Sequence, residues 1–185
     1  MWLWVADHDA DDGTVTQISV YAGRGLLVES TAGVIWMYGT AVEHHSLYQY
    51  QFANTQKVFM GQIQTETPYY QPNPTTAIPF PAVPALNDPA VENSALGLRV
   101  LGSEEILIYS AGLYSFFYNY NVHCSDQGNG EWCQPRIFSV EKSKVSLYNL
   151  ATVGTQNMIE VDGTDIASYT DNVAGFIDAI ALFRS

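Results

Sequence analysis

Two glutamates end two similar stretches of the chain, and together they could act as an acid pair. Residues 58–66 resemble residues 34–43, and the two stretches end 23 residues apart on Glu66 and Glu43. If the stretches are neighbouring strands of one sheet, the glutamates lie about 4.8 Å apart. Two carboxylates held that close do not both ionise easily, so one should keep its proton near neutral pH. An acid beside a carboxylate is the minimum equipment for hydrolysing a glycosidic bond.

Polar side chains surround this pair in the sequence. Gln62 and Gln64 precede Glu66 at intervals of two, so all three should project from one face of a strand. His44 and His45 follow the first glutamate. Because adjacent strand residues point to opposite faces, the two histidines cannot chelate one ion, and one of them is expected to hydrogen-bond to the acid. We predict a hydrogen-bonding platform that includes Gln64, with no metal and no cofactor.

An acidic run near the start of the chain resembles a calcium-binding loop but lacks two required residues. Residues 7–13 alternate aspartates with other residues, as an EF-hand loop does. Asp12 stands where that loop needs glycine, and Ile18 stands where it needs a bidentate glutamate. We therefore interpret the run as an acidic turn.

Strand-like runs recur along the chain. Later runs start at Ile106 and Val145, which lie 48 and 87 residues after Val58. We interpret 48 as two periods of 24, and the remaining 39 as one period with an insertion. Within the last run, alternation predicts Val145, Leu147 and Asn149 on one face. Short strands at a fixed period, with insertions in loops, are typical of a solenoid.

These runs predict an all-β fold, a partial right-handed parallel β-helix (a pectate-lyase-like solenoid), with residues 1–185 forming a single domain. An antiparallel sandwich is the structural alternative, but it needs hairpin turns every 8–12 residues, and these are sparse. The best helical candidate is residues 172–180, which carry an interior glycine and no firm cap.

A proline-rich segment interrupts the period. Seven of the eight prolines lie between Pro68 and Pro89. Proline cannot donate to a central strand ladder, which predicts an extended loop on the body of the molecule. Because the segment begins directly after Glu66, it is either a rim beside the acid pair or a plain connector, and the residues leave both open.

Composition narrows the class of partner. The chain has 7 Lys and Arg against 19 Asp and Glu, for a net charge of −12. Nucleic acids and anionic membrane surfaces are excluded, since both need clustered basic residues, and no apolar run reaches the ~20 residues of a membrane span. A neutral partner remains. The 12 Tyr, 4 Trp and 8 Phe either offer flat faces to sugar rings or fill the core.

The two cysteines bear on the compartment. Cys124 and Cys133 enclose a polar loop, and they form either a disulfide, which would indicate a secreted protein, or two free thiols. The first residues of the chain carry no basic region and turn acidic at once, so no signal peptide is predicted within this chain.

Several longer motifs resemble the C-terminal part of the fungal β-1,3-glucanases of glycoside hydrolase family 55. They are residues 2–9 (WLWVADHD), 39–45 (GTAVEHH), 64–72 (QTETPYYQP) and 111–117 (AGLYSFF), and the resemblance continues through 153–158 to 181–184. A cysteine pair found in relatives ahead of Leu98 is missing here, where residues 87–96 contain none.

The resemblance implies a β-helix that hydrolyses neutral β-1,3-glucan from the chain end with inversion, outside the cell. It gives Glu66 the role of general acid and Glu43 that of holding or activating water. It places Tyr69, His44 and Trp4 beside the glucose subsite. Stacked glutamates about 5 Å apart fit the retaining spacing better than the roughly 6.5–9.5 Å of inverting enzymes, and here we follow the resemblance.

Relatives of this family are several times longer and consist of two β-helices side by side. A partner that supplies the N-terminal half is therefore expected. The alternative to an enzyme is a non-catalytic β-helix fragment that binds sugar or associates with another chain, since a solenoid cut between coils exposes a sheet end. A pectate-lyase-like enzyme is disfavoured, because it needs a basic proton acceptor and calcium-binding acids in register.

Overall fold

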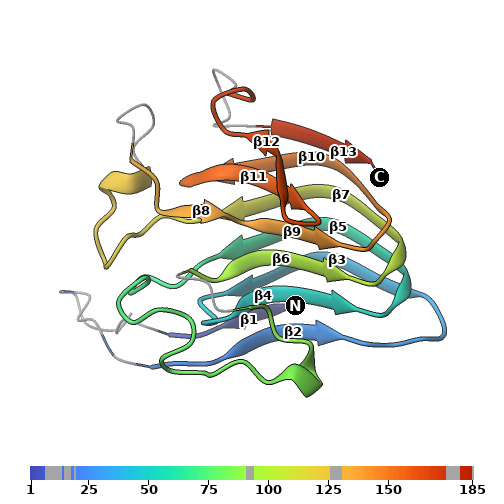
Figure 1. Ribbon diagram of the computed structural model, residues 1–185, viewed down its shortest axis with the longest axis horizontal. Helices are drawn as coiled ribbons and strands as arrows, with labels where there is room; N and C mark the ends of the chain where they lie inside the picture. Colours follow the sequence, from blue (N-terminus) through green and yellow to red (C-terminus); the bar gives the residue numbers. More distant parts are fainter. Residues whose placement is uncertain are drawn as a thin grey trace.

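Strands make up most of the ordered structure in the computed structural model (Figure 1). It describes residues 1–6, 14, 18, 20–90, 94–125, 131–173 and 180–184. Helical structure in these ranges is limited to two three-residue 3₁₀ turns, η1 (Pro84–Leu86) and η2 (His123–Ser125), and no helix among them could cross a membrane. The all-β prediction is confirmed. The predicted helix at 172–180 lies mostly outside the described residues, as does the acidic run at 7–13.

The strands form two sheets, here called sheet I and sheet II. Sheet I has the order β1 (Trp2–Trp4), β3 (Ile35–Glu43), β5 (Gln56–Glu66), β7 (Glu104–Tyr114), β10 (Val145–Val153) and β13 (Ile180–Arg184). Sheet II has the order β2 (Arg24–Val28), β4 (Tyr48–Ala53), β6 (Leu96–Leu101), β9 (Phe138–Glu141), β11 (Thr155–Val161) and β12 (Thr164–Ser168), and β8 (Gln134–Arg136) also pairs with β11.

Neighbouring strands run parallel, except that β13 and β12 pair antiparallel with β10 and β11. From β2 to β7 the chain passes alternately from one sheet to the other (Figure 1). Parallel strands need a crossover rather than a tight hairpin, and here each crossover includes a strand of the opposite sheet. This topology is compatible with the predicted solenoid and rules out the antiparallel sandwich.

The predicted strand register is confirmed, but one interval was misread. Val58 pairs with Ile35 on one side and with Ile106 on the other, and Ile106 pairs with Val145. The 48 residues between Val58 and Ile106 are thus a single step between neighbouring strands, and not two periods of 24. The extra length is the proline-rich segment, which leaves the stack and returns to it.

The core lies between the two sheets. Sheet I contributes buried residues such as Met60, Ile108 and Leu147, and sheet II contributes Phe52, Val100 and Phe138. At about 1.5–3 kcal/mol for each fully buried large apolar side chain, this layer is the main source of stability. It holds the strands in register, and therefore fixes the positions of the side chains on the outer faces.

A column of left-handed residues crosses sheet I. Gly39, Gln62, Ser110 and Asn149 have φ angles of 60°, 52°, 66° and 57°. They occupy the same level in β3, β5, β7 and β10, because the residues on both sides of each are paired in register. One left-handed residue in a strand shifts the alternation of side chains by one position, as in a bulge.

This shift corrects one predicted face. Asn149 does not share the inner face with Val145 and Leu147; it is exposed, whereas both of them are buried. The left-handed residue places two consecutive side chains, Tyr148 and Asn149, on the outer side, and Leu150 returns to the core. The same shift places a ring and a polar group next to each other in β7.

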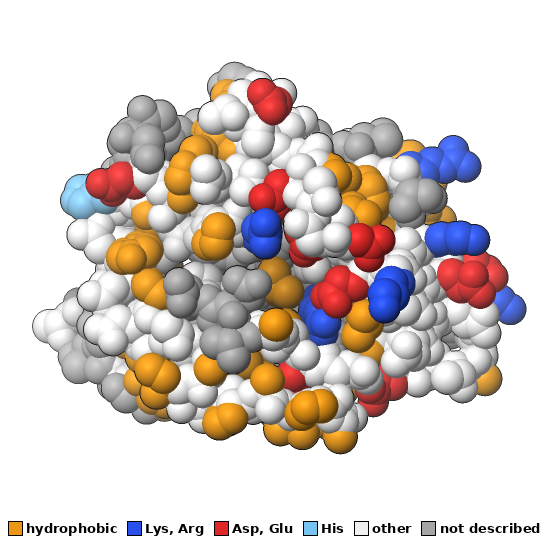
Figure 2. All heavy atoms as spheres, viewed as in Figure 1, with side chains coloured by type: hydrophobic (Ala, Val, Ile, Leu, Met, Phe, Trp, Pro, Cys, Tyr) orange, Lys and Arg blue, Asp and Glu red, His pale blue; other side chains and the backbone are white. Residues whose placement is uncertain are grey.

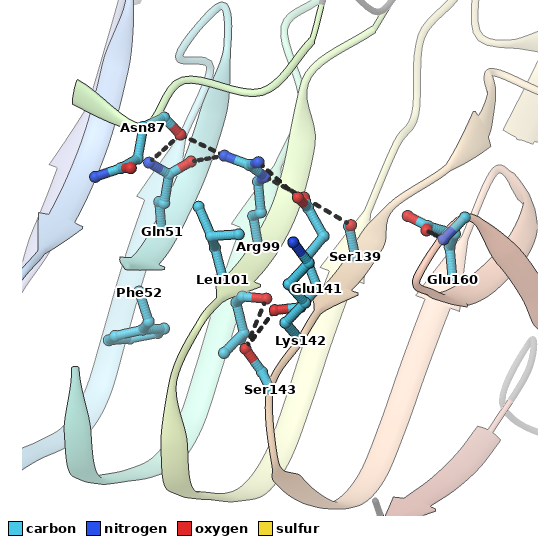
Figure 3. A network of polar contacts seen from close by, with 12 residues as sticks. Gln51, Phe52, Asn87, Arg99, Leu101, Ser139, Glu141, Lys142, Ser143 and Glu160 are labelled. Carbon is cyan, nitrogen blue, oxygen red and sulfur yellow. Dashed lines mark hydrogen bonds and ion pairs between the residues drawn. The ribbon is translucent and has the colours of Figure 1, made fainter. Parts of the chain in front are cut away.

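Polar side chains of sheet II hold the end of the proline-rich segment (Figure 3). Gln51 donates from Nε2 to the carbonyls of Leu86 at 3.2 Å and Asn87 at 3.0 Å. Arg99 donates to Gln51 Oε1 at 2.9 Å and to the Asn87 carbonyl. It also forms a bidentate pair with Glu141 at 2.6 and 2.9 Å. The end of the segment therefore packs on this sheet and supplies hydrogen-bond acceptors to Gln51 and Arg99.

Further contacts fix both ends of the same segment. At its start, Gln71 donates to the Ser46 carbonyl at 2.8 Å and accepts from the Ala95 N–H at 2.6 Å. At its end, the Arg24 guanidinium forms a bidentate ion pair with Asp88. On the side of the molecule shown in Figure 2, basic side chains lie next to acidic ones.

Candidate functional site

Glu43 and Glu66 are paired residues at the ends of β3 and β5, as the period predicted. Gln64 joins them: its Nε2 lies 3.3 Å from Oε1 of Glu43 and 3.2 Å from Oε1 of Glu66. Because Oε1 of Glu43 and Oε1 of Glu66 contact the same nitrogen, the distance between these two oxygens is at most about 6.5 Å, the lower limit of the carboxyl separation in inverting glycosidases. The two carboxylates thus converge on one patch of sheet I.

Gln62, Gln64 and Glu66 share the outer face of β5, as predicted. Gln62 and Gln64 are exposed and Glu66 is half-buried, whereas Ile63 and Thr65 between them point into the core. The left-handed residue at Gln62 sets this alternation, because it places the following odd-numbered residues inward.

An indole holds Glu43 from the neighbouring strand. Trp2 donates from Nε1 to Oε2 of Glu43 at 2.7 Å. Burial raises the pKa of Glu43; the hydrogen bond from Trp2 counteracts this rise, and the nearby charge of Glu66 adds to it. Both carboxylate oxygens of Glu43 face N–H groups that can only donate, from Trp2 and Gln64, and this pattern suits the ionised form.

His44 bridges the first strand and the second glutamate. Its Nδ1 lies 3.2 Å from the carbonyl oxygen of Val5, and its Nε2 lies 3.4 Å from Oε2 of Glu66. A carbonyl only accepts, so Nδ1 carries a hydrogen. A hydrogen bond between Nε2 and the carboxyl of Glu66 then needs one further proton, on either partner. His44 therefore connects the first strand to Glu66, the second member of the acid pair.

The second histidine does not take part. His45 contacts Gln49, which accepts from its backbone N–H at 2.8 Å and lies 3.3 Å from its Nδ1. Burial lowers the pKa of His45. In the described part of the chain, no group of three or more His, Cys, Asp or Glu is arranged to hold a metal ion.

Aromatic rings form a wall around Glu66. The Tyr69 ring lies 4.4 Å from the His44 ring and 3.9 Å from the Phe117 ring, measured between centroids. Tyr114 is paired in register with Glu66 on the next strand, and its ring lies 5.5 Å from that of Phe116. The proline-rich segment therefore supplies a ring to the edge of the site at its very start.

Sequence reasoning chose Trp4 and missed Trp2. The two indoles stack at 5.4 Å, but Trp2 makes the hydrogen bond to Glu43 while Trp4 is paired with Glu43 in register. Tyr114 was missed as well. The available signal was its position, because it stands in register with Glu66 in the next strand-like run, two residues before Phe116 and Phe117.

Two hollows lie on opposite sheets. One of about 450 Å³ lies over sheet I, with Gln62, Gln64, Ser110, Gly112, Tyr114 and Asn149 in its lining. Another of about 630 Å³ lies over sheet II, beside Arg99 and Glu141. The second is larger, but only the first is lined by Gln64, whose amide contacts both members of the acid pair. Away from both, Cys124 and Cys133 are joined by a disulfide.

Comparison with curated proteins finds relatives across nearly the whole chain. A protein named probable glucan endo-1,3-beta-glucosidase, from Arthroderma benhamiae, is 43% identical over 190 residues, covering 99% of this chain and 21% of that protein. A glucan 1,3-beta-glucosidase from Cochliobolus carbonum is 44% identical over 180 residues, covering 94% of this chain and 23% of that protein. The chain is a homologue of part of these fungal glucan 1,3-β-glucosidases.

The predicted relationship with β-1,3-glucanases is therefore confirmed. This glucosidase homologue spans about a fifth of the length of the two glucosidases that it matches. A third relative, named non-secreted LysM effector LysM15, from Penicillium expansum, is 37% identical over 190 residues, covering 97% of this chain and 12% of that protein. No protein-family model matches the chain.

Proposed function

We propose that this chain carries the acid pair of a glycoside hydrolase that cleaves neutral β-1,3-glucan from the chain end with inversion. The observation that carries the proposal is the joined pair itself: one Gln64 amide contacts both Glu43 and Glu66, and Nε2 of His44 lies 3.4 Å from Oε2 of Glu66. In the proposal, a proton is shared across this last contact. The relatives named as glucan 1,3-β-glucosidases support β-1,3-glucan as the substrate class.

In this proposal Glu66 is the general acid. Its carboxyl gives the shared proton to the glycosidic oxygen as the bond from that oxygen to the anomeric carbon breaks. Glu66 becomes a carboxylate, and the leaving sugar gains a hydroxyl. After this step Nε2 of His44 has no hydrogen to donate, because the hydrogen of the neutral ring is on Nδ1 and bonded to the Val5 carbonyl. A proton taken up from solvent between Nε2 and the carboxylate then restores the acid for the next turnover.

Glu43 acts on the attacking water. As a carboxylate it accepts a proton from that water while the oxygen bonds to the anomeric carbon. Burial raises the pKa of Glu43 and so makes its carboxylate a stronger base than an exposed one. Trp2 keeps the carboxylate oriented through the 2.7 Å hydrogen bond.

Rings and amides border the sugar. Trp4, Tyr69 and His44 are proposed to flank the terminal glucose, and Gln64 to hydrogen-bond to it as well as to the acids. Flat aromatic faces beside polar groups suit a ring with axial C–H bonds and equatorial hydroxyls. The exo assignment and inversion rest on the family resemblance, since the spacing of the two carboxylates by itself falls nearer the retaining range.

The two alternating parallel sheets are proposed to be two faces of one right-handed parallel β-helix that acts outside the cell. The two matched glucosidases are about four to five times as long as this chain, so we propose that the rest of such a protein completes the site. Groups outside residues 1–185 would then supply further contacts to the water and the substrate.

The test is sugar release from laminarin, with Glu66→Gln as the control, run on the 185-residue chain and on a full-length relative with the same change. Loss of turnover in the Gln variant of the relative supports the acid role. Proton NMR of the first product gives the stereochemistry: the α-anomer supports inversion and the β-anomer contradicts it. Laminarin binding by the short chain, together with unchanged turnover in the Gln variant of the relative, supports the alternative, a sugar-binding module.

A further inference from the structure

The outer face of sheet I continues beyond the acid pair as an open surface of rings and polar groups. The hollow of about 450 Å³ begins at Gln64, crosses β7 at Ser110 and Gly112, and reaches Asn149 on β10. Its described lining carries no charged side chain, although the whole chain has a net charge of −12. We call this hollow the groove.

Aromatic rings lie in a row beside the groove, and we call them the aromatic strip. Its members are Trp36, Tyr38, Phe59, Tyr109 and Tyr148. Ring centroids are 5.2 Å apart for Trp36 and Phe59, 6.0 Å for Phe59 and Tyr109, and 4.9 Å for Tyr109 and Tyr148. The strip therefore crosses four strands without a break.

The strip is open to solvent along most of its length. Trp36 is 75% exposed, Tyr38 70% and Tyr109 47%. A Cβ on Gly61 would lie 2.7 Å from the Tyr38 ring, so the glycine lets that ring lie across the neighbouring strand. A contiguous exposed apolar patch of this kind marks an interaction site.

In two neighbouring strands, the column of left-handed residues places a polar group next to a ring. In β7, Tyr109 and Ser110 are both outside; in β10, Tyr148 and Asn149 are both outside. A ring next to a hydroxyl or an amide, repeated on successive strands about 4.8 Å apart, matches a polymer of rings that carry hydroxyls.

We propose that the groove and the aromatic strip bind a neutral glucan chain whose reacting end lies at Glu43 and Glu66. The inference rests on the proposed function and adds the path of the remaining sugars, which runs from Gln64 over β7 to β10. Two observations favour a neutral glucan over a protein or an acidic polymer: the groove is uncharged, and Gln64 belongs both to the groove and to the acid pair.

The experiment measures laminarin binding to the 185-residue chain in a Glu66→Gln background, so that turnover does not interfere. Titration calorimetry is compared for three changes: Tyr109→Ala with Tyr148→Ala, the same pair changed to Phe, and Tyr118→Ala. Tyr118 is the matched control, since it is 50% exposed and lies away from the groove. A Gln62→Ala variant, at an exposed position in the groove, serves if the double Ala variant fails to fold.

We expect the double Ala change to raise the Kd for laminarin about tenfold, as for a truncated aromatic anchor. The double Phe change keeps the rings and should keep the Kd within about twofold, and Gln62→Ala should raise it about threefold through a lost hydrogen bond. Tyr118→Ala should leave it unchanged.

Equal affinity in all variants, or no laminarin binding by the chain, overturns the inference. The inference is also overturned if sedimentation shows self-association of the chain and the double Ala change abolishes this association without weakening laminarin binding. Hydrolysis by the full-length relative is measured separately. If the relative hydrolyses laminarin but binding to the chain does not depend on the rings, only the inference fails. If binding depends on the rings but the relative does not hydrolyse laminarin, only the catalytic proposal fails.

Discussion

The outer faces of the two sheets carry similar polar side chains in different surroundings. On sheet II, Gln51 and Arg99 donate to a carbonyl at the end of the proline-rich segment, and Arg99 also pairs with Glu141. On sheet I, Gln64 and the two glutamates bond mainly to one another. The strands of both sheets are parallel and share one core, so the fold itself does not make the difference.

The difference lies in what covers each face. Under the segment, the donors of Gln51 and Arg99 meet fixed acceptors, and removing one of these partners weakens the hydrogen bonding of a buried group. On the open face, donors and acceptors are oriented by their neighbours and remain within reach of a ligand. We therefore expect substitutions on sheet II to change mainly stability, and those on sheet I to change mainly activity.

Matched glutamates test this division with the largest expected effect. Glu66→Gln should lower kcat/KM on laminarin about 10²–10⁴-fold, as for loss of a general acid, with little change in stability. Glu141→Gln should keep activity but lower the free energy of unfolding by about 1–3 kcal/mol, because the buried Arg99 loses its carboxylate partner. Urea unfolding and laminarin assays on a full-length relative with the same changes would measure both. Equal loss of activity in the two variants would contradict the division.

Matched glutamines give the next largest effect. Gln51→Ala should cost about 2 kcal/mol of stability, since it removes one acceptor of the buried Arg99 and the amide that donates to the Leu86 and Asn87 carbonyls. Gln64→Ala should cost less than about 0.5 kcal/mol, in line with exposed positions, yet reduce turnover about tenfold. The reduction is expected because the two carboxylates lose the N–H that joins them. Reversal of the two outcomes would place the functional face on sheet II.

Trp2→Phe should move the acidic limb of the pH profile. The hydrogen bond from Trp2 lowers the pKa of Glu43 against the rise caused by burial, so its removal raises that pKa further. Glu43 must be ionised to accept a proton from water, and activity should therefore fall off at a higher pH than in the wild type. The measurement is kcat/KM against pH in the full-length relative. An unmoved limb would show that another group titrates there.

Glu43→Gln should have a small effect on the free energy of unfolding, which we expect to rise by less than about 1 kcal/mol at pH 7. The pKa of Glu43 is raised in the folded state above its usual 4.5. The protonated form therefore favours folding below the unfolded pKa, and this contribution is lost as pH rises through the folded pKa. The gain in the Gln variant should disappear in acid. Thermal unfolding at pH 7 and pH 4 would reveal it, and a larger gain in acid would refute the sign.

Residues that follow a strict period could be predicted from the sequence. The pairing of Glu43 with Glu66 rests on strands of similar length 23 residues apart, with no insertion between their ends. The step from β5 to β7 was misjudged because the length of the proline-rich segment equals about one period, and length does not distinguish a coil from a loop.

Details that depend on single backbone angles or on side-chain reach could not be predicted. The face of Asn149 follows from its left-handed φ, which alternation alone does not reveal. Trp2, and not Trp4, reaches Glu43 because an indole N–H extends diagonally across the pair of strands. The wall that includes Phe117 needed knowledge of how the chain turns after β7.

The left-handed column at Gly39, Gln62, Ser110 and Asn149 gives sheet I a modular geometry. Because β3, β5, β7 and β10 each carry the left-handed residue at the same level, insertion of a whole coil between β7 and β10 would lengthen the groove by one strand. A single inserted residue would instead exchange the inward-facing and outward-facing side chains over half the length of one strand. Engineers who wish to tune the reach of this surface should therefore duplicate entire repeats and leave the spacing within each repeat untouched.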